Sequence, residues 1–418
     1  MKILIKQAQV ISPSSPFNGQ TKDILITNGK IEKIADAITE KADQAIEQKG
    51  LCISIGWMDV FADFADPGFE YRENIESGAR AAAAGGFTDV MLLPNTNPVA
   101  DSKSQIDYIV QKAKQVVINI HPIAAITRKA EGKELAEMYD MQQTGALAFS
   151  DGINPIQNSG LLLKALQYVK TVDGTVIQIP DDTSIGANGL MNEGIISTQM
   201  GLPGKPTMAE ELMVARDIKL ARYADSKIHF TGVSSPKSLE YIKRAKEGEI
   251  KVSCSITPYQ VCFCDEDLQQ YDTNLKLNPP LRSRADMTAI RKALFDGSID
   301  CIASHHLPQN WDSKTCEFEY AKPGMISLET TFAALTTAGL PVADFVQMQT
   351  VNARKLFGLS IPEIKEGEMA CITLFNPTTE FVFEQEMLRS RSKNSPFIGK
   401  HLKGKVLGII NKAQFQLN

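Results

Sequence analysis

Residues 56–68 read Gly56-Trp57-Met58-Asp59-Val60-Phe61-Ala62-Asp63-Phe64-Ala65-Asp66-Pro67-Gly68. The first half of this stretch is apolar and predicts a buried strand over residues 58–63, and the second half predicts a loop that follows the strand directly. Short apolar runs of the same kind, each followed by a helical stretch, return along the middle of the chain. We therefore interpret residues 56–68 as the first unit of a repeating β-then-α pattern.

Eight short apolar runs predict strands, and helical stretches separate them. This number of units is typical of a TIM-type (β/α)8 barrel, an α/β fold whose active site lies at the C-terminal ends of the strands. The predicted strands are residues 58–63, 88–93, 116–126, 146–150, 175–179, 227–233, 251–257 and 300–304. The predicted helices are residues 74–84, 104–114, 134–143, 160–170, 209–223, 236–247 and 285–295.

Both ends of the chain are rich in β-forming residues and differ from the middle. The β-rich runs are residues 2–11, 23–34, 370–375, 380–383 and 404–410. Asn28-Gly29 is the dipeptide that favours a type I′ hairpin turn. Because chain termini commonly lie close together, we predict a small β-sandwich domain built from residues 1–53 and 365–418, beside a barrel of residues 54–364.

Composition and charge exclude several classes of protein. The net charge is -5, and Lys and Arg do not form the clusters expected of a nucleic-acid-binding protein. No apolar run reaches the roughly 18 residues of a membrane span, and the start of the chain is not typical of a signal peptide. The seven Cys are odd in number and scattered, which favours a reducing cytoplasm. The most basic stretch, residues 389–405, fits either a solvated rim or a phosphate site, and we interpret it as a rim.

Several longer motifs resemble those of one family. Residues 59–68 resemble the loop Asp-x-His-x-His-x-Arg-Asp-Pro-Gly of dihydroorotases, and residues 85–98 resemble the family's second-strand segment, which ends in Pro-Asn-Thr-Asn-Pro. The likeness covers essentially the whole chain and is most similar to the bacterial class I branch. Further motifs in the family's order are residues 131–138, 148–152, 189–194, 201–204, 271–282 and 393–397.

The resemblance implies a fold, a reaction and a cofactor. The fold is a barrel of the amidohydrolase superfamily with a small flanking β domain. The reaction is the reversible closure of N-carbamoyl-aspartate to dihydroorotate in pyrimidine biosynthesis, with one or two zinc ions activating a bridging hydroxide. A metal is needed because water is a weak nucleophile at neutral pH, and a bound ion lowers the pKa of that water.

The positions that hold the metals in the family carry other residues here. By the resemblance, the family places His at the first, second, fourth and fifth of six positions, and Asp at the third and sixth. In this chain the six read Phe61, Asp63, Gly152, Ile179, Gly232 and His305. Zinc needs three or four converging donors, and four of these residues offer no side-chain donor. We therefore expect no catalytic residue and no metal, with Asp63, Asp151 and His305 as the fallback ligands of a rebuilt zinc site.

Substrate recognition is only half preserved. The Arg that binds the substrate carboxylate in the family falls on Ala65, and the late His falls on Gln309, so the planar clamp for a carboxylate is missing. Asn95 and Asn278 match positions where the family contacts substrate with Asn, although both lie in strings that also favour turns. Together with Arg282, these two Asn are the candidate ligand-binding residues.

Two functional hypotheses follow. The preferred one is a catalytically inactive dihydroorotase homologue that acts as a scaffold or regulatory partner. The resemblance suggests aspartate carbamoyltransferase as that partner. The alternative is an active dihydroorotase or related cyclic amidohydrolase with a rebuilt zinc site. A third interpretation, a small-molecule sensor, would use Asn95, Asn278 and Arg282. We expect a cytoplasmic homo-oligomer that binds neither nucleic acid nor membrane.

Overall fold

A ring of eight parallel strands forms the centre of the protein in the computed structural model, which describes all 418 residues. An isolated parallel bridge between Ala62 and His306 joins the first strand to the segment that follows the last one. The predicted TIM-type barrel is therefore confirmed. In chain order the strands are β6 (Trp57–Ala62), β7 (Phe87–Leu92), β8 (Asn119–Ala124), β9 (Ala148–Phe149), β10 (Thr175–Gln178), β13 (Lys227–Phe230), β14 (Val252–Ile256) and β15 (Cys301–Ile302).

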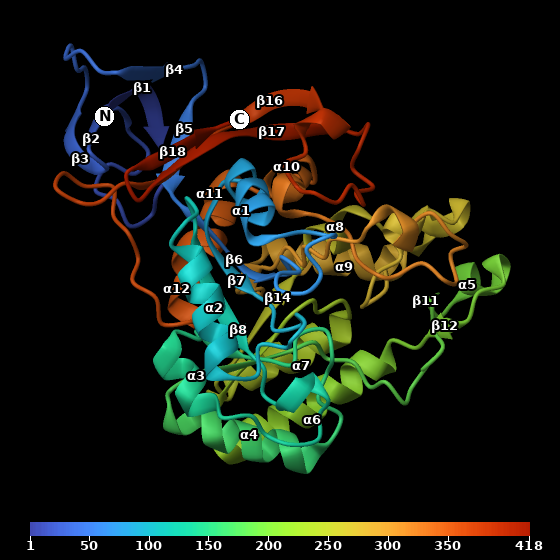
Figure 1. Ribbon diagram of the computed structural model, residues 1–418. Coiled ribbons are helices and arrows are strands. Elements are labelled where there is room, and N and C mark those ends of the chain that lie inside the picture. The colour runs from blue at the N-terminus through green and yellow to red at the C-terminus, as the bar shows by residue number, and fades with distance from the viewer.

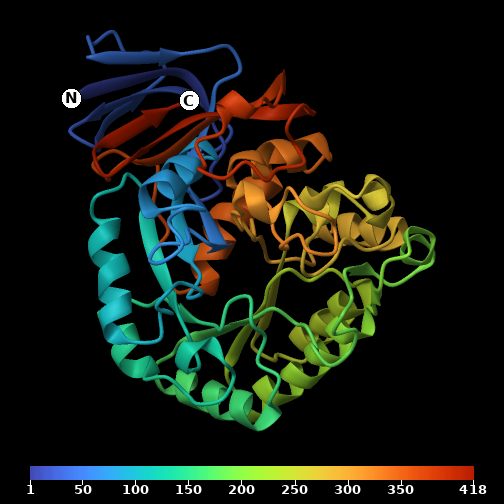
Figure 2. The same ribbon diagram turned by 45° about the vertical axis from the view of Figure 1, so that its right-hand side comes forward.

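Helices surround this ring, as Figure 2 shows. Side-chain caps begin several of them: Asn74 and Ser283 each accept the backbone N–H three residues ahead, which satisfies a donor that the helix itself leaves free. All seven predicted helices are present. They are α1 (Ile75–Ala84), α2 (Lys103–Ala113), α3 (Met138–Thr144), α4 (Ser159–Thr171), α6 (Met208–Ala224), α7 (Pro236–Glu247) and α9 (Arg284–Phe295).

Several shorter elements do not stand out in the sequence. Between β10 and α6 the chain leaves the barrel as an arm, which protrudes on the right of Figure 1. The arm contains β11 (Met191–Asn192), α5 (Ile195–Met200) and β12 (Gly204–Lys205). The remaining helices are α8 (Pro258–Cys262), α10 (Thr331–Thr337), α11 (Val342–Gln347) and α12 (Ala353–Leu356).

A separate β domain is assembled from both ends of the chain, and Figure 1 shows the two termini within it. Its sheet runs in the order β18-β17-β16-β5-β1-β2-β3, with β4 paired to β1. Asn28 and Gly29 connect β2 to β3 with φ angles of 50° and 80°, the left-handed backbone that a type I′ turn requires. The strands are β1 (Lys2–Val10), β2 (Thr21–Thr27), β3 (Lys30–Ala35), β4 (Gln44–Glu47), β5 (Cys52–Ile55), β16 (Cys371–Val382), β17 (His401–Asn411) and β18 (Gln414–Leu417).

The antiparallel pairing of β5 with β16 joins the N-terminal and C-terminal parts of this sheet. The predicted β domain of two termini is thereby confirmed, while its limits at residues 53 and 365 stay a prediction. None of the helices combines the length and the apolar character that crossing a membrane requires.

Candidate functional site

The C-terminal ends of the barrel strands are filled mainly by apolar side chains. Phe61 near the end of β6 and Ile179 just after β10 belong to one buried cluster, and their exposed fractions are 0% and 2%. The same cluster of 13 buried residues includes Met91 of β7 and Ala303, which follows β15. Two of the six positions that the resemblance assigns to metal ligands are therefore part of a hydrophobic core.

His305 lies against this core instead of standing free in a pocket. Its ring stacks on Phe61 with centroids 4.5 Å apart, and its Nε2 lies 2.8 Å from Thr231 Oγ1. Ser255 Oγ donates to Thr231 Oγ1, so the Thr231 hydroxyl is left to donate to His305 Nε2. Burial lowers the pKa of His305 to about 3, so the ring is neutral at physiological pH and its proton lies on Nδ1. That Nδ1 has no hydrogen-bond partner.

At the barrel mouth, the residues around Gly152 and Gly232 leave no room for a side chain at either position. A Cβ at Gly232 would lie 2.6 Å from His305 Cε1, and a Cβ at Gly152 would lie 1.7 Å from Asn95 Oδ1. Both glycines also have left-handed backbones, with φ angles of 71° and 63°. The His305 ring and the Asn95 amide therefore occupy the space that a ligand side chain would need at either position.

The carboxylates of Asp63 and Asp151 are hydrogen-bonded to other groups of the chain. Asp63 accepts the Ala65 N–H at 2.6 Å and lies 3.7 Å from Arg72 Nη2; burial raises the pKa of this carboxyl, and the Arg72 charge opposes that rise. Asp151 accepts both the N–H and the hydroxyl of Thr127, and burial raises its pKa to about 6.

The fallback residues Asp63, Asp151 and His305 do not form a metal-holding group. The chain contains no group of three or more His, Cys, Asp or Glu arranged for that purpose. The residues present therefore do not fit the zinc site that the resemblance implies.

The candidate ligand-binding residues are mostly occupied by contacts within the chain. The Asn95 amide bridges Asp151 O and Ile153 N, both at 3.0 Å, and so fastens the loop after β9. Arg282 is 5% exposed, and its guanidinium donates to Ser234 Oγ, Asn192 Oδ1 and Glu210 Oε2.

Asn278 differs, because it lines a cavity of about 340 Å³ beside the arm. There its Oδ1 accepts from Lys205 Nζ at 3.0 Å, and Lys205 also lies 2.5 Å from Asp181 Oδ2. No pattern in the sequence points to Lys205, because it lies in the arm and meets Asn278 only in the fold.

Sequence reasoning also missed a buried network beside the barrel mouth. His306 Nδ1 accepts the Ser327 N–H at 3.2 Å, so its proton is on Nε2, which lies 3.6 Å from Glu73 Oε2. Glu73 is fully buried and accepts the Ser390 hydroxyl and the Arg391 N–H. This network fastens residues 389–392 onto the barrel.

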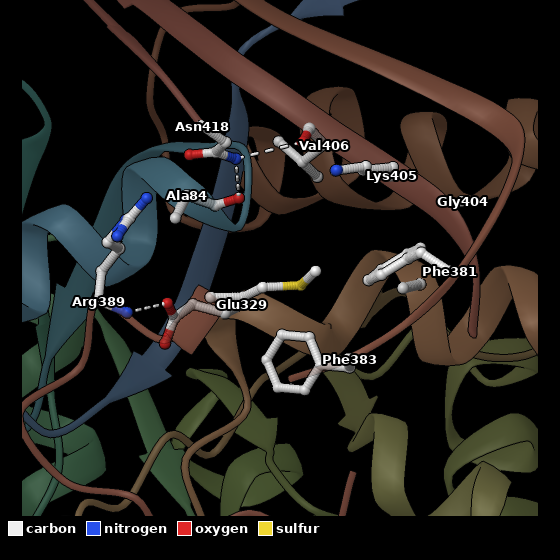
Figure 3. Close-up of a pocket in the computed structure, with 11 residues that line it drawn as sticks. Ala84, Glu329, Phe381, Phe383, Arg389, Gly404, Lys405, Val406 and Asn418 are labelled. Atoms are coloured by element: carbon white, nitrogen blue, oxygen red, sulfur yellow. Dashed lines mark hydrogen bonds between the residues drawn. The ribbon is translucent and has the colours of Figure 1, made fainter. Parts of the chain in front are cut away.

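Glu329 holds the same segment from a neighbouring cavity. Its carboxylate accepts the N–H groups of Arg389 and Ser390, and Figure 3 shows it beside Phe383 in the cavity wall. Burial raises the pKa of Glu329 to about 7. No pattern in the sequence pairs these acids with a segment more than 50 residues away, so only the fold shows the contact.

Comparison with known proteins gives one consistent family. A family described as "Dihydro-orotase-like" matches residues 50–238. A dihydroorotase of Syntrophus aciditrophicus is 41% identical over 414 residues, which is 97% of each chain. A dihydroorotase of Acetivibrio thermocellus is 40% identical over 410 residues, covering 97% of this chain and 96% of that one. Among solved structures, the L-hydantoinase (dihydropyrimidinase) of Arthrobacter aurescens has a TM-score of 0.85 at 20% identity, over 99% of this chain and 95% of that one.

Proposed function

This chain belongs to the dihydroorotase family, and from that premise we propose that it is a dihydroorotase-like protein of pyrimidine biosynthesis that has lost catalysis and serves as a scaffold or regulatory partner. One observation carries the proposal: of the six positions that the resemblance assigns to metal ligands, Phe61 and Ile179 belong to a packed apolar core. His305 stacks on Phe61, and neither Gly152 nor Gly232 has room for a side chain. Without a bound metal there is no activated hydroxide to attack the cyclic amide.

The substrate side of the site supports the same proposal. The position of the family's carboxylate-binding Arg is Ala65, which is 1% exposed and offers no charge. Arg72, the nearest guanidinium to Asp63, is 3.7 Å from that carboxylate and is partly neutralised by it. A dihydroorotate anion would therefore lose the bidentate contact that orients its carboxylate.

Metal content of the protein purified without chelator tests the proposal first. We expect less than about a tenth of an equivalent of zinc by inductively coupled plasma mass spectrometry, and no hydrolysis of dihydroorotate. One or two equivalents of zinc, with hydrolysis abolished by a chelator, would contradict the proposal.

Bound zinc and chelator-sensitive hydrolysis would instead support the second candidate function, an active dihydroorotase or related cyclic amidohydrolase with a rebuilt zinc site. It is favoured by the relatives named dihydroorotase, which are 41% and 40% identical over nearly the full length. Asp63, Asp151 and His305 would be its ligands. Each would have to leave its present hydrogen-bond partner, so metal-loaded protein should differ from metal-free protein in structure at the barrel mouth.

The proposed partner is aspartate carbamoyltransferase, in an assembly that contains more than one copy of this chain. A stable interface of this kind buries about 1,000 Å² or more. The apolar side chains Met208 and Leu212 lie one turn apart on α6 and are 51% and 48% exposed, so they are available for such a contact. We expect the transferase to co-purify with the tagged full-length chain from its native host. A chain that purifies alone, and is monomeric by light scattering, would count against the scaffold.

A further inference from the structure

A cavity of about 460 Å³ lies between the loop after β15 and residues 385–394, and Gln309 is the one lining residue that it shares with the family's metal and substrate positions described above. Its volume is in the range of small-molecule sites. We propose that this cavity binds a nucleoside monophosphate, with the phosphate held by Lys314, Arg391 and Lys393 and the base placed against Trp311 and Tyr71. The proposal does not depend on whether the barrel is catalytic, because none of these residues belongs to the metal positions.

The charge of the lining favours an anion. Three cationic side chains line the cavity, and no carboxylate does. Lys314 is 8% exposed and its ammonium donates only to Thr273 O, at 2.7 Å, which leaves two of its three N–H groups without a partner. Lys393 uses two of its three, on Leu388 O and Ser390 O. Arg391 donates only its backbone N–H, to Glu73, so its guanidinium is free.

The burial of Lys314 also favours an anionic ligand. Burial lowers the pKa of Lys314 to about 7, the Lys276 charge acts in the same direction, and the Asp272 charge opposes them without restoring the usual value. Asp272 itself accepts the Asn274 N–H and is not part of the lining. A phosphate would supply the counter-charge that the buried ammonium lacks.

The rest of the lining favours a flat heterocycle. Trp311 is 74% exposed and Tyr71 is 54% exposed, which is unusual for large aromatic rings beside one cavity. Such rings bind nucleic-acid bases by stacking, with little preference for the base. Gln309 donates its amide N–H to Pro323 O at 3.0 Å, which fixes the amide orientation and leaves its buried Oε1 without a donor. An N–H or hydroxyl group of the ligand would satisfy that oxygen.

The proposal assigns ligand binding to part of the basic stretch, residues 389–405, which we interpreted from the sequence as a solvated rim. Arg391 and Lys393 lie on the cavity wall because Glu73 and Glu329 fasten residues 389–391 onto the barrel. The same acids accept backbone N–H groups and not the side-chain cations, so the positive charges stay available for a ligand.

Tryptophan fluorescence offers a direct test, because the chain has two Trp and Trp57 is fully buried. The full-length protein is titrated with UMP, CMP, AMP and GMP up to about 1 mM, and calorimetry measures binding independently. We expect saturable quenching by the nucleotides, with nucleosides binding at least about tenfold more weakly because they lack the charge-assisted contacts. Trp311→Phe should remove the fluorescence change and leave calorimetric binding detectable.

Variants locate the site. Arg391→Ala and Lys393→Ala should each weaken nucleotide binding at least about tenfold, and Arg389→Ala, an exposed Arg of the same segment outside this cavity, should leave it unchanged. The proposal is overturned by no saturable binding of any nucleotide, by unchanged affinity in Arg391→Ala and Lys393→Ala, or by inorganic phosphate binding as tightly as the nucleotides.

Discussion

Gly232 is one of the two glycines at the barrel mouth where packing leaves no room for a side chain, because a Cβ there would meet the His305 ring at 2.6 Å. Gly297 has a similar left-handed backbone, with φ of 76° against 71°, but open space around it. Backbone strain alone costs about 1 kcal/mol, and overpacking adds about 1–3 kcal/mol. We expect Gly232→Ala to lower the free energy of unfolding by about 3 kcal/mol in urea denaturation, and Gly297→Ala by about 1 kcal/mol.

A double variant separates crowding from strain at this position. In Gly232→Ala with His305→Ala, the crowding contribution should disappear, so the two single effects should not add. Simple additivity of the two single effects would show that the His305 ring moves aside without cost.

Asp151 gives the barrel mouth a dependence on pH. Burial raises its pKa from 3.8 to about 6, so between these values the folded protein binds more protons than the unfolded chain. Stability contributed by Asp151 is therefore largest at low pH and falls as the pH rises through about 6. We compare the free energies of unfolding of Asp151→Asn and the parent by urea denaturation. The difference, variant minus parent, should increase by about 2 kcal/mol between pH 4.5 and pH 7.5. Parallel stability curves for the two proteins would contradict this.

At these positions the sequence predicted which side chains lack a metal donor, but it did not predict how the side chains pack. The identities of Phe61 and Gly232 were enough to predict that side-chain donors are missing. That the His305 ring fills the space in front of Gly232, and that the Asn95 amide closes over Gly152, depends on contacts 56 to 74 residues apart in the chain. Such contacts follow from the closure of the barrel, which a local pattern does not describe.

At the scale of elements, α12 is joined to β7 by a buried ion pair at the N-terminal face of the barrel. Arg354 Nη2 lies 2.7 Å from Asp89 Oδ2, and His121 Nε2 lies 2.9 Å from Asp89 Oδ1. Burial alone would raise the pKa of Asp89, but the His121 hydrogen bond and the Arg354 charge outweigh it and hold the pKa well below its usual range. The ion pair therefore stabilises the fold at neutral pH, and its contribution is lost as the pH falls toward that pKa.

Asp89→Asn leaves Arg354, which is 1% exposed, without its counter-charge. We expect this change to destabilise the protein by about 3–5 kcal/mol, seen as a lower thermal midpoint. Asp89→Asn combined with Arg354→Met should recover much of the loss, because no buried charge is left unpaired. A double variant as unstable as Asp89→Asn would show that packing around β7, and not the charge, is responsible.

The elements themselves were largely predictable. The strands β6 and β7 are buried along their whole length, as parallel barrel strands are, so they appear in the sequence as mainly apolar runs, interrupted only by Asp59 in β6 and by Thr88 and Asp89 in β7. The arm with β11 and β12 and the short helices α10 to α12 were not predicted. Their strands have two residues and their helices four to seven, which is too short to show a period.

At the scale of the whole molecule, an aromatic cluster joins the β domain to the barrel. Phe375 of β16 is fully buried, and its ring lies 5.3 Å from both Trp57 of β6 and Phe332 of α10. Trp57 is also 4.9 Å from Phe345 of α11. Strand β16 of the β domain therefore completes the core behind β6, and we expect the β domain and the barrel to unfold together.

Phe375→Ala tests this coupling, because it removes a ring that both parts share. We expect a loss of about 3–5 kcal/mol in the free energy of unfolding, with the fluorescence of buried Trp57 and the far-UV circular dichroism shifting to the same lower midpoint in urea. Phe415→Ala, which removes a half-buried ring within the β domain alone, should cost less. If Phe375→Ala produced two separate transitions, with Trp57 reporting only the later one, the barrel would be stable without the C-terminal strands and the coupling would be wrong.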